Sequence, residues 1–302
     1  MGRDLKVRGH VLHVEEFGDA SSPSVLFLHG GPGMGAYHFE RFQADRLGHH
    51  LRLITVDQRG VLRSAPIPDG EPLGVMDVIE DCEALRVDLG VDRWSIIGHS
   101  FGGYLAVLYA RTHPTTVDRL VLDNASLDLG SSARSLLAAA AMEFGAAADA
   151  SSARACLALA YASGDTSVNY LWDQLTPWLG NLGHRRDNIY IHGENKQLVD
   201  DLMVKAPFPI EWWLRGGTHQ QRLVAEGRMF VPLWNRLELV THKTLLVKGL
   251  YDVVLAPDQI GAYLHAKPDT ELRVFRQSAH FTHMEEPDRY AAVVTEFLCG
   301  AS

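Results

Sequence analysis

Ser100 stands in the segment WSIIGHSFGG (residues 94–103), with Gly98 and Gly102 two positions away on either side. The apolar run before this serine is typical of a buried strand, and the residues after it have the apolar rhythm of a helix. The two glycines would allow a sharp turn between these elements, which lifts the serine hydroxyl out of the sheet. We therefore predict that Ser100 is a nucleophile.

A serine that attacks a carbonyl group needs backbone donors for the oxyanion that forms. The N–H of Phe101 is one candidate, because it would open the helix after Ser100 and point at the reacting centre. The segment HGGPG (residues 29–33) follows an apolar run and can approach a ligand closely through its glycines. We expect the N–H of Gly31 to be the second donor.

The nucleophile also needs a base to take its proton and a carboxylate to orient that base. Asp252 follows the apolar run TLLVKG (residues 244–249), at the sheet edge where ligands gather in α/β proteins. His280 follows the last apolar run, within SAHFTHMEEPDRY (residues 278–290). We predict Asp252 as the acid and His280 as the base. Two alternatives stay open, namely His283 as the base and Asp123, which ends RLVLD (residues 119–123), as the acid.

These residues need a scaffold that brings the ends of several strands together. Short apolar runs, of the kind that strands show when both faces are buried, occur at residues 24–29, 51–57, 94–98, 119–123, 244–249 and 271–275. Segments with helical periodicity separate most of these runs, as at 75–89 and 101–113. The alternation predicts an α/β fold with a mainly parallel sheet flanked by helices, preceded by a β-hairpin over residues 5–17.

One long segment breaks this alternation. From about residue 127 to residue 235 no apolar run of the strand type occurs, and an alanine-rich, helix-favouring stretch stands in its place. We predict a helical cap domain at 127–235, inserted into a core domain formed by 1–126 and 236–302. Five of the six tryptophans fall in the cap, where we expect most of them to pack helices together.

Composition excludes several classes of protein. The 302 residues are 46% hydrophobic and 22% charged, a balance typical of a globular domain. A net charge of −9 without a basic run argues against nucleic acid as a partner. No apolar stretch has the length of a signal peptide or a membrane span, so we expect a cytoplasmic protein with no membrane contact. The three cysteines are far apart and offer no zinc spacing, so no metal or other cofactor is expected.

The motifs together resemble one group of proteins. HGGPG, DQRG (57–60), DCEALR (81–86), GHSFGG, GLYD and AHFTHMEEP are similar to the signatures of the proline iminopeptidase (prolyl aminopeptidase) group of α/β-hydrolases, over roughly residues 20–120 and 240–299. The resemblance implies the α/β-hydrolase fold and the chain order Ser100, Asp252, His280 for nucleophile, acid and base. It also implies substrates with a free amino terminus, often proline. Leu62 and Ala279 depart from the group, which commonly has glycine at both positions.

In that group, glutamates of the cap bind the ammonium of the substrate, and the candidates here are Glu194, Glu211 and Glu226. We expect a serine hydrolase that forms an acyl-enzyme with a small molecule or short peptide, most simply an aminopeptidase. Carboxylesterases, lactonases and carbon–carbon bond hydrolases share the fold and stay open as alternatives. So does a ligand-binding protein of this fold without catalysis.

Overall fold

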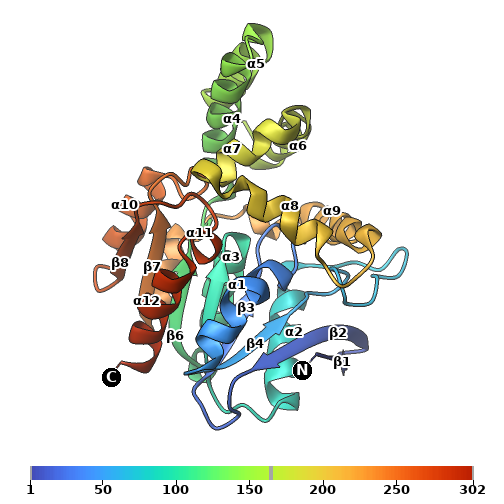
Figure 1. The fold of residues 1–302 in the computed structure, drawn as a ribbon, viewed down its shortest axis with the longest axis vertical. Coiled ribbons are helices and arrows are strands. Elements are labelled where there is room, and N and C mark those ends of the chain that lie inside the picture. Colours follow the sequence, from blue (N-terminus) through green and yellow to red (C-terminus); the bar gives the residue numbers. More distant parts are fainter. Residues whose placement is uncertain (1, 163–165, 301–302) are drawn as a thin grey trace.

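The computed structural model describes residues 2–162 and 166–300, without the side chains of residues 194, 196, 200 and 235. Its centre is an eight-stranded sheet with the order β1-β2-β4-β3-β5-β6-β7-β8 (Figure 1). The strands are β1 (Arg3–Val7), β2 (His10–Phe17), β3 (Ser24–Leu28), β4 (Arg52–Val56), β5 (Trp94–His99), β6 (Val117–Asp123), β7 (Lys243–Gly249) and β8 (Glu271–Phe275).

The pairing of the strands is mainly parallel. β1 and β2 form the predicted hairpin, and β2 pairs with β4 in antiparallel fashion. All further neighbours, from β4 through β3, β5, β6 and β7 to β8, are parallel. The carboxyl ends of these six strands therefore meet at one edge of the sheet, and predicted site residues follow five of them, β3 and β5 to β8.

Helices cover both faces of this sheet. Side chains alternate along a strand, so Ile96 of β5 packs on one face and Ile97 on the other, and both are fully buried. One face packs against α1 (Tyr37–Gly48) and α12 (Pro287–Cys299). The other packs against α2 (Val75–Asp88), α3 (Phe101–Thr112) and α10 (Pro257–Ala266). Burial on both faces explains why the central strands are continuous apolar runs.

The described residues between β6 and β7 contain no strand. They form α4 (Leu129–Ala146), α5 (Ala150–Ala160), α6 (Val168–Asn181), α7 (Asp187–Tyr190), α8 (Gln197–Val204) and α9 (Gly216–Glu226), joined by short 3-10 helices. α4, α5 and α6 rise away from the sheet in Figure 1 and share a hydrophobic cluster of their own. By contrast, Leu223, Phe230 and Leu237 pack into the core cluster. The division into a core and a cap domain at 127–235 stays a prediction.

Aromatic side chains hold these helices to one another and to the core. Trp178 packs edge-on against Phe144 of α4, and the indole of Trp234 donates a hydrogen bond to Asp128 at 3.0 Å. Trp213 packs against Tyr37 of α1. Such contacts are the packing role that we expect for most of the tryptophans.

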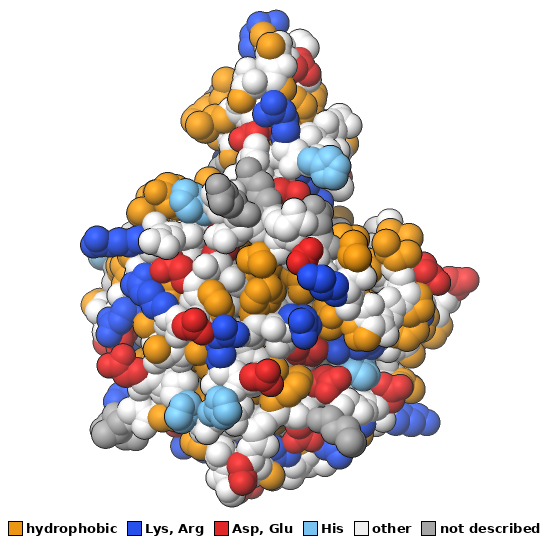
Figure 2. Space-filling view, in the orientation of Figure 1, with side chains coloured by type: hydrophobic (Ala, Val, Ile, Leu, Met, Phe, Trp, Pro, Cys, Tyr) orange, Lys and Arg blue, Asp and Glu red, His pale blue; other side chains and the backbone are white. Residues whose placement is uncertain are grey.

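The surface is mixed in character. Figure 2 shows acidic and basic side chains interspersed over the core and hydrophobic side chains on the projecting helices. Met142 and Tyr161 are among the exposed hydrophobic residues of that projection. Within residues 2–162 and 166–300, no helix is both long enough and apolar enough to cross a membrane.

Candidate active site

Ser100 occupies the sharp turn between β5 and α3, with φ of 56° and ψ of −122°. This backbone conformation is strained for a residue with a Cβ, at a cost of about 1–3 kcal/mol, and persists only where the surroundings hold it. The Ser100 N–H donates to the carbonyl of Asp123 at 2.9 Å, and the Ser100 carbonyl accepts from Gly103 and Ser126. The turn that carries the serine is therefore anchored to β6 and to the residues that follow it.

Close backbone contacts explain the glycines on either side of the serine. A Cβ on Gly98 would lie 2.5 Å from the carbonyl oxygen of Gly102, and a Cβ on Gly102 would lie 2.0 Å from that of Leu28. Both distances are far inside van der Waals contact. Neither position has room for a side chain, so the spacing seen in the sequence is a requirement of the turn.

The HGGPG loop packs directly against the serine. A Cβ on Gly30 would lie 2.7 Å from Cβ of Ser100 and 3.3 Å from its Oγ. Gly31 has φ of 117°, a conformation that favours glycine. Phe101 begins α3, and the first N–H groups of a helix have no partner within it. Gly31 and Phe101 therefore lie in segments next to Ser100, while their role as oxyanion donors stays a prediction.

His280 and Asp252 form a hydrogen-bonded pair. Nδ1 of His280 lies 2.9 Å from Oδ1 of Asp252, and both side chains are buried. Because an ionised carboxylate can only accept, Nδ1 carries the proton and Nε2 is left as the basic nitrogen. The His280 ring packs against His99, the residue before Ser100, with centroids 4.7 Å apart. The predicted base thus lies beside the serine turn.

The surroundings of Asp252 keep it ionised. Its carboxylate also accepts from the N–H groups of Val254 and Leu255, both at 3.0 Å, and from Nζ of Lys248 at 3.2 Å. Burial opposes ionisation, but the interactions with His280, Lys248 and the backbone prevail and lower the pKa of Asp252 to about 2. A negative charge is therefore available to balance a protonated imidazole at His280.

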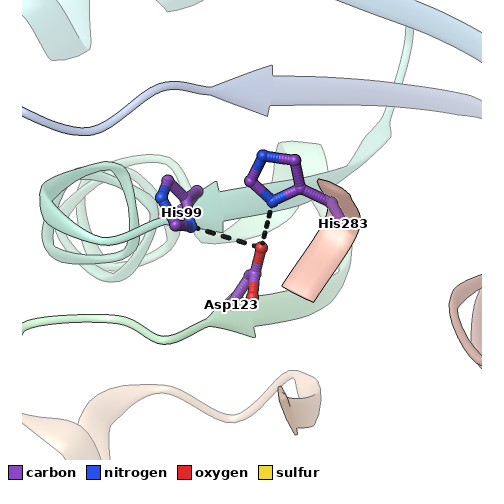
Figure 3. Close-up of side chains that lie close together, drawn as sticks. All are labelled: His99, Asp123 and His283. Carbon is purple, nitrogen blue, oxygen red and sulfur yellow. Dashed lines mark hydrogen bonds and ion pairs between the residues drawn. The ribbon is translucent and has the colours of Figure 1, made fainter. Parts of the chain in front are cut away.

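The two alternatives from the sequence, Asp123 and His283, are joined to each other. Nδ1 of His283 lies 2.9 Å from Oδ2 of Asp123, and Nδ1 of His99 lies 3.2 Å from the same oxygen (Figure 3). Nε2 of His283 is engaged by Nδ1 of His38 at 2.9 Å, and Thr282 donates to Asp123 at 2.5 Å. Both ring nitrogens of His283 are occupied, so it has no nitrogen to offer Ser100.

His99, Asp123 and His283 form a second cluster, which is fully buried next to the serine turn. Burial lowers the pKa of His283 to about 4, so its ring is neutral near pH 7. His99, Asp123 and His283 each offer a ligand atom, all within 4.8 Å of one another, and two imidazoles with a carboxylate are donors that zinc accepts. The hydrogen bonds just described already use the carboxylate and His283, so we interpret the cluster as a buried polar network.

Comparisons with known proteins address the fold. A family model described as alpha/beta hydrolase fold matches residues 23–151. A meta-cleavage product hydrolase from Pseudomonas fluorescens superposes over 100% of this chain and 99% of its own, with a TM-score of 0.69 and 19% identity. The chain has the alpha/beta hydrolase fold. The predicted fold class is thereby confirmed.

Two further similarities are to proteins whose names contain "proline iminopeptidase". The proline iminopeptidase-related protein of Thermus thermophilus has a TM-score of 0.72 and 20% identity, covering 99% of this chain and 97% of its own. A proline iminopeptidase of Neisseria meningitidis is 40% identical over 115 residues. That match covers 37% of this chain and 36% of the relative, so it spans little more than a third of the curated protein.

The predicted cap glutamates are not brought to the serine turn in the part of the structure that is described. The side chain of Glu194 lies outside the described part of the structure. Glu211 is exposed, and Glu226 is exposed and pairs with Arg228 at 3.3 Å. Among the described contacts, none links Glu211 or Glu226 to Ser100. A role for any of the three in binding substrate stays a prediction.

The sequence reasoning missed one carboxylate near the candidate base. Glu285 accepts hydrogen bonds from the N–H groups of Ala279 and Phe281, the two neighbours of His280. It also accepts from the N–H of His192, which lies 93 residues earlier in the chain. Because all three partners are backbone groups, no pattern of side chains in the sequence indicates these contacts.

Proposed function

We propose that this protein is a serine hydrolase that works through an acyl-enzyme. The observation that carries the proposal is the 2.9 Å pair of His280 and Asp252 beside a strained turn that presents Ser100. Oγ of Ser100 attacks the substrate carbonyl while Nε2 of His280 takes its proton. The N–H groups of Gly31 and Phe101 donate to the oxyanion.

The second half of the reaction returns the enzyme to its starting state. His280 gives its proton to the leaving group as the tetrahedral intermediate collapses to an acyl ester of Ser100. It then takes a proton from water, which attacks the ester, and gives that proton to Oγ of Ser100 as the acid is released. The ionised Asp252 stabilises the imidazolium in both halves, because the carboxylate lies in hydrogen-bond contact with Nδ1.

For the substrate we propose a small molecule or short peptide with a free amino terminus, hence an aminopeptidase of the proline iminopeptidase type. The relative named proline iminopeptidase, 40% identical over 115 residues, supports this choice. A buried ammonium needs a carboxylate partner, and Glu194, Glu211 and Glu226 are the candidates.

The alternative is a hydrolase of esters, lactones or carbon–carbon bonds with the same catalytic residues. The exposure of Glu211 and the pairing of Glu226 with Arg228 favour it, because neither carboxylate is reserved for a buried ammonium. The meta-cleavage product hydrolase with the same fold is a further argument for this alternative.

A panel of substrates tests the proposal. We expect the purified protein to cleave proline and alanine β-naphthylamide, and Ser100→Ala to remove that activity. Turnover of p-nitrophenyl acetate without turnover of either amide would support the alternative. If no carbonyl substrate is cleaved, while the same compounds bind, the protein is a ligand-binding member of the fold.

A further inference from the structure

Glu285 is the last residue of α11 (Thr282–Glu285), the helix that follows the loop carrying His280. Its Oε2 accepts the N–H of Ala279 at 2.9 Å and the N–H of Phe281 at 3.2 Å. One carboxylate oxygen therefore holds the backbone on both sides of the candidate base. The orientation of the His280 ring depends on that backbone, so Glu285 can act on the base without touching substrate.

The other oxygen of the same carboxylate reaches the helical segment between β6 and β7. Oε1 accepts the N–H of His192 at 2.6 Å. We call residues 190–192 the cap strap. Within it, the carbonyl of Tyr190 accepts the N–H of His280 at 2.9 Å, and Ile191 is buried in a cluster with Phe281.

The cap strap also touches the loop of the candidate acid. The ring of His192 stacks on Tyr251, with centroids 3.7 Å apart and planes 4° from parallel. Tyr251 immediately precedes Asp252 in the chain. The strap therefore lies on both loops that supply the acid–base pair, and Glu285 is the side chain that ties it to the loop of His280.

We propose that Glu285 is a positioning residue: its three backbone hydrogen bonds lock the loop that carries His280 to the cap strap. The kinetic part of this proposal rests on the function proposed above for His280. The structural part, the lock itself, does not.

Burial raises the pKa of Glu285 to about 7, although its three backbone hydrogen bonds lower it. Each of these bonds is donated by a backbone N–H, so the ionised carboxylate, which accepts at both oxygens, satisfies all three donors.

Amide hydrogen exchange at His192, Ala279 and Phe281 tests the lock without any substrate. In the parent protein, we expect all three amides to be protected, after correction for intrinsic exchange, because one carboxylate accepts all three. Glu285→Gln places an NH₂ group against backbone N–H donors, so it cannot keep all three bonds. We expect it to lower the three protection factors by roughly tenfold or more.

Glu286→Gln is the matched control. Glu286 accepts from the N–H of Gln277 and the hydroxyl of Ser278 in the same loop, at 3.0 and 2.7 Å. No described contact joins it to the strap. We expect this variant to leave the protection of the His192 amide unchanged, which separates loss of the lock from general loosening of the loop.

The positioning role is tested by kinetics on whichever substrate the parent turns over. Because Glu285 acts through His280, we expect Glu285→Gln to lower kcat by roughly tenfold while KM stays within about twofold. Unchanged kcat together with lost amide protection would refute the positioning role. Unchanged protection in Glu285→Gln would refute the lock. A failure of the proposed function gives a different result, namely parent activity that survives Ser100→Ala.

Discussion

Replacing each of the two buried aspartates by asparagine distinguishes the two Asp–His pairs. In Asp252→Asn the side chain keeps its size but loses its charge, and its NH₂ group can donate to Nδ1 of His280. That hydrogen bond moves the imidazole proton to Nε2, so the ring can no longer accept the proton of Ser100. In Asp123→Asn the same change affects His283, whose Nε2 is already engaged by His38.

The size of the effect follows from these contacts. Loss of the correct tautomer in a triad of this kind lowers kcat by about 10⁴, equivalent to about 5 kcal/mol of activation free energy. Asp252→Asn also leaves Lys248 without its ion-pair partner at 3.2 Å, so we expect a stability loss of about 1–3 kcal/mol. Asp123→Asn disrupts the bonds to Thr282 and His283 and should cost similar stability. Its kcat should stay within about tenfold of the parent.

The assay compares kcat, KM and thermal stability for the parent and both variants on one substrate. Measuring stability beside the rate separates loss of folded protein from loss of catalysis. A larger fall of kcat in Asp123→Asn than in Asp252→Asn, at comparable stability, would show that Asp123 orients the base. The assignment of Asp252 would then be wrong.

Three further outcomes are expected. Ser100→Ala should abolish turnover and keep the far-ultraviolet circular dichroism of the parent, and activity within about tenfold of the parent would remove Ser100 from the mechanism. Gly102→Ala should destabilise the protein by more than about 3 kcal/mol in chemical denaturation, because its Cβ would meet the carbonyl of Leu28 at 2.0 Å. Gly145→Ala, in an open position of α4, should instead raise stability by up to about 1 kcal/mol, and equal effects of the two changes would contradict the packing argument. For an aminopeptidase, N-acetylation of a proline arylamide should lower kcat/KM by at least about 100-fold, and equal cleavage of free and blocked substrates would exclude that activity.

Much of the fold follows from local patterns. The runs at 24–29, 94–98 and 244–249 are mainly apolar because the strands are buried on both faces, and that property is visible in the sequence without any knowledge of neighbouring strands. The spacing of Gly98, Ser100 and Gly102 is equally local, since the turn brings backbone atoms of nearby residues into contact. These features allowed the fold class and the position of the serine turn to be predicted.

Which acid pairs with which base depends on contacts between residues far apart in the chain. Asp123 and Asp252 both follow parallel strands, and His280 and His283 stand three residues apart, so the sequence alone leaves four combinations open. Only the order of β6 and β7 in the sheet, together with the path of the loop after β8, joins Asp252 to His280 and Asp123 to His283.

The difference between local patterns and long-range contacts also applies to the rest of the site. The sequence by itself determined an alternating α/β chain with a serine turn, because strand burial and tight turns depend on neighbouring residues. The tertiary structure decided which carboxylate meets which imidazole, left Glu211 and Glu226 at the surface, and brought Glu285 to the backbone of His192. Such contacts join residues far apart in the chain through main-chain donors and packed helices, and neither leaves a periodic or compositional pattern in the sequence.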